Sequence, residues 1–255
     1  MSPALEGRVA LVTGAAQGIG AEIARRLHDD GARIAVNDLR DSDKLAAVSA
    51  PISGLRTAAD VADREAVMAM VAHVERELGE VDVLVCNAAL ETMGEFQTQS
   101  TEDFWRQIDV NLGGAFACIQ AVLPAMLAKG AGKIVVITSV AGVNGWARAV
   151  GYSASKAGLI GLVKSLGAEL APAGIHITGI APGAIDSPQI EVDAVEYGVT
   201  LDALRKRYTE MTPLGRIGQP ADIAGLVSLL AGPAVGDAFV GQILQPNGGI
   251  ERGGG

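Results

Sequence analysis

Short apolar runs alternate with longer segments of helical pattern along almost the whole chain. Runs rich in valine, isoleucine and leucine predict β-strands at residues 9–12, 33–38, 54–58, 81–86, 133–138, 175–180 and 239–244. Helical periodicity with start and stop signals predicts helices over 21–27, 41–48, 63–78, 101–129, 152–171 and 220–230. The alternation predicts an α/β fold: a single doubly wound parallel β-sheet of about seven strands, Rossmann-like, with helices on both faces, in one domain over residues 1–255.

The pattern breaks between residues 182 and 212, where the chain is polar, aperiodic and punctuated by prolines. Such a stretch is too long for a plain connector. We therefore expect a substrate lid over residues 185–212 that contains short helices. The glycine-rich residues 251–255 predict a flexible tail.

Three glycines follow the first predicted strand and open the first predicted helix. Gly14 permits a tight turn, Gly18 lets the backbone approach a pyrophosphate, and Gly20 allows the helix to pack closely on the strand. The free N–H groups at the start of the helix then face the anion. An ordinary glycine-rich turn is the alternative, but the strand–turn–helix context favours a phosphate site.

Asp38 ends the second predicted strand, 24 residues after Gly14. This lies near the offset of about 20 residues at which dinucleotide sites place a ribose-binding acid. Its carboxylate would accept hydrogen bonds from the ribose hydroxyls and repel a 2′-phosphate. Arg40 is the contrary signal, since an arginine two residues further on has the reach to bind that phosphate. A turn-forming aspartate is the alternative role for Asp38.

A second group of residues points to proton transfer. Ser139 follows the fifth predicted strand, and Tyr152 and Lys156 share one helical face at i and i+4. A free tyrosine has a pKa of about 10, and a nearby ammonium favours the phenolate. Tyr152 would exchange a proton with an alcohol or carbonyl oxygen that Ser139 also contacts. Each residue alone has an ordinary structural role; the combination is far more specific.

These motifs resemble those of the short-chain dehydrogenase/reductase family in its single-domain form. The resemblance rests on Thr13-Gly14-x3-Gly18-Ile19-Gly20, Asp60-Val61, Asn87-Ala88, Asn111, Ser139 with Tyr152-x3-Lys156, and Pro182-Gly183, in family order and spacing. Residues 213–220 resemble the 3-oxoacyl-reductase-like branch. Ala89 and Ser187 depart from the usual glycine and threonine, and Pro246-Asn247 replaces a common acidic residue, but no catalytic group is lost.

The resemblance implies a role for each matching residue. Tyr152 would be the general acid/base, Lys156 would tune it and bind the nicotinamide ribose, Ser139 would polarise the carbonyl, and Asn111 would hold a water in a proton relay. The implied cofactor is NAD, because NADP-preferring relatives usually place a basic residue where this chain has Gln17. The implied cofactor-binding residues are Gly14, Gln17, Gly18, Ile19, Gly20, Asp38, Leu39, Asp60, Val61, Asn87, Ala88, Tyr152, Lys156, Pro182, Gly183, Ile185 and Ser187.

Composition narrows the partners. A net charge of −9 argues against nucleic acid, and no basic amphipathic segment indicates a membrane surface. The N-terminus lacks a signal-type apolar region and no apolar run in the sequence is long enough to span a membrane, so we expect a cytoplasmic protein. Two cysteines and three scattered histidines give no metal-ligand spacing, so no metal site is expected. The helix from Tyr152 is apolar nearly all round, which predicts burial on two sides. We therefore expect a homo-oligomer, a tetramer as in the family or at least a dimer, assembled through the helices that begin at Thr101 and Tyr152.

We expect the substrate, a small secondary alcohol or ketone, between residues 91–93, 140–150 and 185–211. Apolar walls would come from Trp146, Ile190, Tyr197 and Tyr208, whereas Glu91 and Arg148 would instead recognise a polar group. Two other functions stay open: a 3-oxoacyl-thioester reductase and a catalytically idle dinucleotide-binding protein. The complete set Asn111, Ser139, Tyr152 and Lys156 favours an enzyme over the idle protein.

Overall fold

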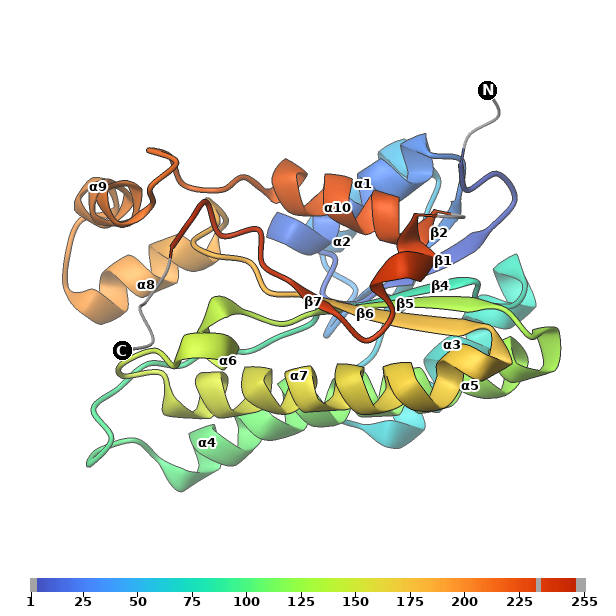
Figure 1. The fold of residues 1–255 in the computed structure, drawn as a ribbon, viewed down its shortest axis with the longest axis horizontal. Helices are drawn as coiled ribbons and strands as arrows, with labels where there is room; N and C mark the ends of the chain where they lie inside the picture. The colour runs from blue at the N-terminus through green and yellow to red at the C-terminus, as the bar shows by residue number, and fades with distance from the viewer. Residues whose placement is uncertain (1–3, 233–234, 251–255) are drawn as a thin grey trace.

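The fold is a seven-stranded parallel sheet with helices on both faces, as predicted (Figure 1). A computed structural model describes residues 4–232 and 235–250, so the predicted tail at 251–255 lies outside the described residues. The strand order is β3-β2-β1-β4-β5-β6-β7. The strands are β1 Val9–Val12, β2 Arg33–Asp38, β3 Leu55–Ala58, β4 Val83–Cys86, β5 Gly132–Ile137, β6 Ile175–Ile180 and β7 Ile243–Leu244.

Two apolar layers cover the sheet. Helices α1 (Gly18–Asp29), α2 (Asp43–Ser49) and α10 (Pro220–Ala231) lie on one face, and α3 (Arg64–Leu78), α5 (Gly114–Lys129) and α7 (Val150–Leu170) lie on the other. Each face buries its own cluster of aliphatic side chains. Both neighbours of β1 run in register with it, Val12 lying opposite Val36 and Val85. The strand order reverses between β1 and β4, where open α/β sheets bind ligands.

The predicted helix over 101–129 is interrupted by one wide turn. It consists of α4 (Thr101–Ile108), a π-helical turn at Asp109–Gly113, and α5. Such turns are frequent at functional sites, and this one carries Asn111. The whole segment is long and apolar enough to cross a membrane, but half of its most apolar window is buried inside the protein, as in a core helix.

The predicted lid contains two helices, α8 (Gln189–Tyr197) and α9 (Leu201–Met211), with a small apolar cluster of their own. A short helix that was not predicted, α6 (Val140–Asn144), follows β5. The predicted last strand over 239–244 is wrong for most of its length, because only Ile243–Leu244 pairs with β6. Gly241 takes a φ of 71°, a left-handed conformation that ends regular strand geometry before β7.

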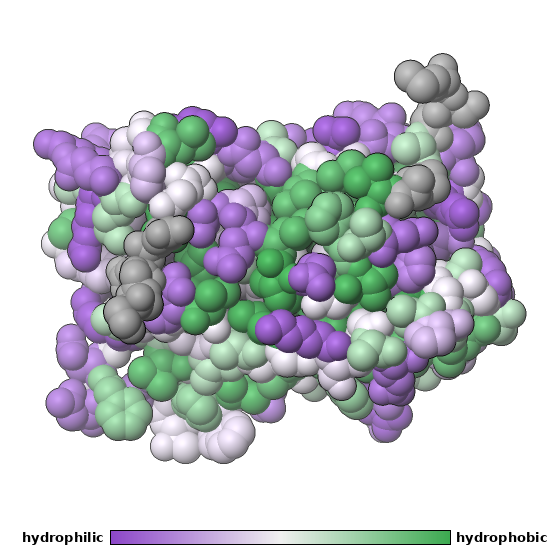
Figure 2. Space-filling model, in the orientation of Figure 1, coloured by the Kyte–Doolittle hydropathy of each residue, from purple (hydrophilic) through white to green (hydrophobic). Residues whose placement is uncertain are grey.

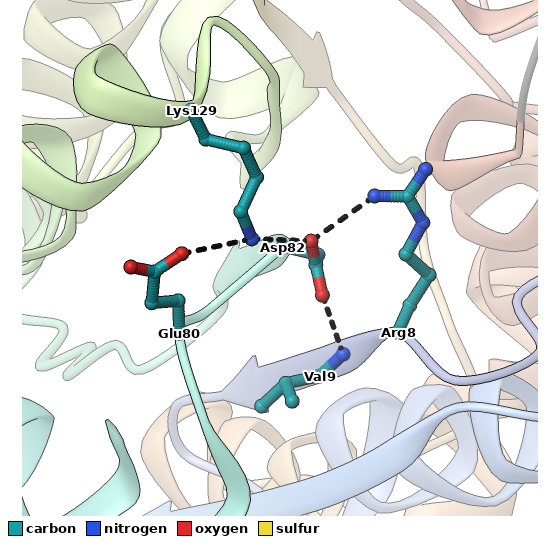
Figure 3. Close-up of polar contacts among 5 residues, drawn as sticks. All are labelled: Arg8, Val9, Glu80, Asp82 and Lys129. Atoms are coloured by element: carbon teal, nitrogen blue, oxygen red, sulfur yellow. Dashed lines mark hydrogen bonds and ion pairs between the residues drawn. The ribbon is translucent and has the colours of Figure 1, made fainter. Parts of the chain in front are cut away.

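Asp82 ties together the amino-terminal end of the sheet, opposite the carboxyl ends of the strands (Figure 3). Its carboxylate accepts hydrogen bonds from Arg8 (3.1 Å), from the backbone N–H of Val9 (2.9 Å) and from Lys129 (2.9 Å), while Lys129 also pairs with Glu80 (3.3 Å). Burial raises the pKa of the Asp82 carboxyl, but the Val9 N–H and the two cations outweigh burial and hold the pKa below its usual value. The cluster joins β1, the start of β4 and the end of α5, far from the predicted catalytic residues.

Candidate active site

The glycine turn after β1 needs glycine for two different reasons. Gly14 and Gly18 have positive φ values of 62° and 57°, which other residues rarely adopt. A Cβ on Gly14 would lie 2.7 Å from the Cα of Ala88, and one on Gly20 would lie 2.4 Å from the carbonyl oxygen of Gly14. The turn is therefore packed directly against the end of β4.

Asn87 and Thr13 hold this packing in place. The Asn87 amide donates to the carbonyl oxygens of Thr13 and Gly14, each at 3.0 Å. The Thr13 hydroxyl accepts from the backbone N–H groups of Asn87 (3.0 Å) and Ala88 (3.1 Å). The ends of β1 and β4 thus form one rigid floor for a ligand.

The predicted site residues gather in two adjoining hollows at the carboxyl ends of the strands. Gly14, Gln17, Gly18, Ile19, Gly20, Asp38, Leu39, Asp60, Val61, Asn87 and Ala88 line a cleft above the glycine turn. A neighbouring cavity of about 230 Å³ is lined by Ser139, Tyr152, Lys156, Pro182, Gly183, Ile185 and Ser187. Three residues, Ile19, Asn87 and Ser187, line both the cleft and the cavity. Because the two hollows adjoin, the expected dinucleotide would reach from the glycine turn to the cavity that holds Tyr152.

Asp38 lies at the far end of the cleft. Its carboxylate accepts from the backbone N–H of Leu39 (2.7 Å) and from that of Ala16 (3.2 Å), so β2 is tied to the glycine turn. Arg40 is exposed, and Asp41 pairs with Arg56 (3.4 Å).

Two basic residues near the cleft escaped the sequence analysis. Lys44 Nζ donates to the side-chain oxygen of Gln17 at 2.9 Å, which brings a cation to the neutral glycine turn. Arg106 lines the cleft and pairs with Asp60 at 2.6 Å. Burial raises the pKa of Asp60, but the hydrogen bond from Arg106 and the N–H of Ala62 hold the pKa below its usual value. No sequence motif links these pairs, since tertiary packing alone brings them together.

Ser139, Tyr152 and Lys156 meet in the second cavity. Ser139 caps α6, its hydroxyl accepting from the N–H of Ala141 (3.1 Å). Tyr152 and Lys156 follow one another on the first turns of α7, with Lys156 Nζ at 5.4 Å from the centre of the tyrosine ring. Lys156 is almost fully buried, and its ammonium donates to the carbonyl oxygen of Ile137 at 2.8 Å.

Burial dominates the proton affinities of these groups. It raises the pKa of Tyr152 well above its usual value, and the Glu91 carboxyl raises it further, whereas the Ser139 hydroxyl lowers it. Burial also lowers the pKa of Lys156 to about 8, against the opposing effect of Glu91. The expectation of a lowered Tyr152 pKa is therefore wrong for the chain by itself.

Asn111 and Gln107, both buried, hold the segment that follows β4. The Asn111 amide accepts from the N–H of Leu90 (2.7 Å) and donates to the Leu90 carbonyl (2.9 Å) and to the Ser155 hydroxyl (2.9 Å). Gln107 accepts from the N–H of Thr92 (3.1 Å) and donates to the Thr92 hydroxyl (2.8 Å). Gln107 was not predicted. The water relay assigned to Asn111 stays a prediction.

The expected pocket residues divide into two groups. Glu91, Trp146, Ile190 and Tyr208 line the cavity, together with residues that were not singled out, among them Asp193 and Met211. Tyr197 and Arg148 do not line it. The Tyr197 hydroxyl instead accepts from the Trp146 indole at 2.8 Å, and Arg148 pairs with Glu95 (3.3 Å) and lies over the Tyr197 ring. Arg148 is thus engaged outside the cavity.

A glycine turn at the crossover of a parallel sheet, beside a buried serine, tyrosine and lysine, defines a dinucleotide-dependent oxidoreductase. The chain belongs to the short-chain dehydrogenase/reductase family, because a family model described as short chain dehydrogenase matches residues 8–196. It is an oxidoreductase that acts on alcohol and ketone groups.

Curated relatives match nearly the whole chain. A short-chain dehydrogenase/reductase of Armillaria gallica is 38% identical over 252 residues, 96% of each chain. A 2-dehydro-3-deoxy-L-rhamnonate dehydrogenase (NAD(+)) of a Sphingomonas species is 40% identical over 233 residues, 88% of each chain. A 3-oxoacyl-[acyl-carrier-protein] reductase of Staphylococcus aureus is 38% identical over 247 residues, 94% of this chain and 97% of the relative.

Proposed function

We propose that the protein is an NAD(H)-dependent oxidoreductase that interconverts a small secondary alcohol and a ketone, with Tyr152 as the general acid/base. The observation that carries the proposal is the meeting of Ser139, Tyr152 and Lys156 in a cavity that adjoins the glycine-turn cleft. A bound nicotinamide cofactor would accept or supply the hydride and, when oxidised, add a positive charge beside Tyr152.

The chain's own residues then handle the proton. In the oxidation, the substrate hydroxyl lies against both the Ser139 hydroxyl and the Tyr152 oxygen, and its proton passes to the tyrosine. In the reduction, Tyr152 returns the proton to the carbonyl oxygen. The buried Lys156 ammonium favours the phenolate that the oxidation needs, and Asn111 keeps its assigned role in proton relay.

Asp38 supports the preference for NAD. Its carboxylate is fixed at the far end of the cleft, where a 2′-phosphate would be repelled. The name of the Sphingomonas relative also specifies NAD(+). Lys44 and Arg40 are the opposing charges, and both are exposed to solvent, which weakens their attraction for a phosphate.

A 3-oxoacyl-thioester reductase is the second candidate, favoured by the Staphylococcus relative. The net charge of −9 disfavours it, because binding of an acyl carrier would call for a basic surface patch. An idle dinucleotide-binding protein would have no need of the assembled Ser139, Tyr152 and Lys156.

The proposal includes a homo-oligomer, a tetramer or at least a dimer, assembled through the helices that begin at Thr101 and Tyr152. Large apolar side chains are exposed on two separate surfaces: Trp105, Phe116 and Leu127 on α4 and α5, and Leu229 and Val235 on and after α10. Figure 2 shows the apolar area over α10. Apolar faces of this kind mark protein–protein contacts, and two of them let one chain touch more than one copy. Light scattering tests the tetramer.

A cytoplasmic location is also part of the proposal. The two cysteines, Cys86 and Cys118, are free and buried, as is usual where thiols stay reduced. Fractionation of the source cells tests this location.

A panel of secondary alcohols and ketones, assayed with NAD(H) and NADP(H) by NADH or NADPH absorbance in both directions, tests the activity. The proposal expects at least one pair to turn over, with higher kcat/KM for NAD(H). Turnover of 3-oxoacyl thioesters alone would favour the second candidate.

A further inference from the structure

Two carboxyl groups from different elements line the substrate cavity. Glu91 belongs to the segment that follows β4, whereas Asp193 belongs to α8 in the lid. Both are close enough to Tyr152 to raise the pKa of its phenol. The proton exchange with the substrate described above makes no use of either carboxyl.

Glu91 is held in this place by the protein around it. The residue before it, Leu90, is clamped by Asn111, and the residue after it, Thr92, is clamped by Gln107. Both clamping side chains are buried, at 1% and 0% exposure. The backbone of Glu91 is therefore fixed between two anchored neighbours, and among the described residues its carboxyl has neither a hydrogen bond nor an ion pair.

The Asp193 side chain is held on the lid by a hydrogen bond within its own helix. Its carboxylate accepts from the Gln189 side-chain amide at 3.0 Å, one turn earlier on α8. The end of α8 is fastened by the hydrogen bond from Trp146 to Tyr197. The two carboxyls thus face one cavity from two anchored supports.

Positive charge is scarce inside this cavity. Among the described residues that line it, Lys156 is the single base, and its ammonium already donates to Ile137. Three nearby arginines are engaged elsewhere: Arg148 pairs with Glu95, Arg205 pairs with Asp186 (3.0 Å), and Arg207 lies over the Tyr197 ring. Among the described residues, neither Glu91 nor Asp193 forms an ion pair, and Lys156 acts on Glu91 only as a nearby charge that lowers its pKa.

We propose, resting on the proposed function, that the substrate carries a protonated amino group that binds between Glu91 and Asp193. The alcohol or ketone carbon then faces Ser139 and Tyr152, so the substrate is an amino alcohol or the corresponding amino ketone. Trp146, Tyr208 and Met211 supply an apolar wall for the rest of the molecule.

A cation suits this cavity better than a neutral polyol or an anion. Burial and, to a smaller extent, the neighbouring Asp193 carboxyl together raise the pKa of Glu91 to about 8, against the lowering effect of Lys156, so the two carboxyls disfavour each other's charge. An ammonium between them relieves this repulsion, whereas a hydroxyl leaves it in place and a carboxylate adds to it. The same ammonium offsets the effect of the carboxyls on Tyr152 and makes the phenolate easier to form.

Three alcohols of nearly equal shape test this inference: 2-amino-1-phenylethanol, 1-phenyl-1,2-ethanediol and mandelate. They differ in one group, which is an ammonium, a hydroxyl or a carboxylate at neutral pH. We expect kcat/KM with NAD⁺ to be about tenfold or more higher for the amine than for the diol, and lowest for mandelate, as a charge-assisted hydrogen bond requires. Calorimetric Kd values for the three compounds give the same order without turnover.

Glu91→Gln and Asp193→Asn should each lower the preference for the amine over the diol by about tenfold. Glu191→Gln removes an exposed carboxylate on the same helix as Asp193 and should leave the preference unchanged. An amine that binds no tighter than the diol, or a preference that survives both variants, overturns the inference. The proposed function fails by different results: hydride transfer that persists in Tyr152→Phe, or no hydride transfer with any alcohol. The two failures can be told apart because the order of the Kd values does not depend on turnover.

Discussion

Asn111 is hydrogen-bonded to both backbone groups of Leu90, accepting from its N–H at 2.7 Å and donating to its carbonyl at 2.9 Å. The same amide donates to Ser155, whose hydroxyl donates to the carbonyl oxygen of Tyr152 at 2.7 Å. One side chain on a π-helical turn thus links the segment that carries Glu91 to the helix that carries Tyr152. Asn111 sets the geometry of the cavity whether or not it also holds a water.

Asn111→Asp should separate these two elements. The carboxylate keeps the acceptor for Leu90 N–H but loses the donors, and it faces the Leu90 carbonyl with like charge. A buried group left in this state costs about 1–3 kcal/mol, so we expect kcat/KM to fall about 10- to 100-fold and the melting temperature to fall. Asn144→Asp, at an exposed position, is the control. An Asn111→Asp protein with parental kinetics would refute the linking role.

The burial of Lys156 should make the free energy of unfolding depend on pH. Its pKa falls from 10.5 to about 8 in the folded chain, so between these values the unfolded chain binds one more proton and parental stability rises with pH. Lys156→Met lacks this rise. We expect the unfolding free energy of the variant minus that of the parent to fall by about 3 kcal/mol from pH 8 to 10.5. Urea unfolding at several pH values measures it, and a constant difference would contradict the buried ammonium.

Asp82→Asn should weaken the fold and spare the chemistry. The carboxylate accepts one backbone and two charged hydrogen bonds, so its loss should lower the free energy of unfolding by about 1–3 kcal/mol at pH 7, with kcat/KM unchanged. Because the pKa of Asp82 is held below 3.8, its stabilising effect is present above that pH and is lost as pH falls through the folded pKa. Thermal melts should show parent and variant converging in acid. Equal stability at pH 7 would mean that the cluster in Figure 3 contributes nothing.

Asp38→Ala should narrow the preference for NAD(H). Removing the carboxylate takes away the repulsion of a 2′-phosphate, while Lys44 and Arg40 remain. We expect kcat/KM with NADP(H) to rise and the NAD(H)-to-NADP(H) ratio to fall about tenfold or more, and Lys44→Ala should move the ratio the opposite way. If the unmodified protein already uses NADP(H) as well as NAD(H), the basic residues dominate and the role given to Asp38 is wrong.

Much of the fold was predictable, because buried parallel strands appear as apolar runs and glycine turns have a fixed spacing. The carboxyl ends of parallel strands lie on the same side of a sheet, which is why Gly14, Asp38, Asn87 and Ser139, each at or just after a strand end, gather there. The length of the last strand was overestimated, because residues 239–244 include Gly241, and the hydrophobic pattern does not reveal its left-handed backbone.

The sequence did not predict the contacts of side chains that are brought together only by tertiary packing. Gln107 lies one turn before Asn111 and looks like any polar residue of an amphipathic helix, yet it is fully buried against Thr92. Asp193 lies on a lid helix whose rotation the sequence does not fix, and so it was not expected to line the same cavity as Glu91. Tyr197 was assigned to the pocket for its ring, whereas its hydroxyl fastens the lid to Trp146.

The most direct test is Tyr152→Phe, measured for both turnover and NADH binding. The phenol oxygen is the proposed proton donor, and loss of a general acid/base typically costs about a hundred- to ten-thousand-fold in rate. We predict a kcat lowered by that factor on the best alcohol or ketone, with the Kd for NADH, from quenching of tryptophan fluorescence, within about threefold of the parent. A purified Tyr152→Phe protein that binds NADH and retains substantial turnover would contradict the assignment of Tyr152.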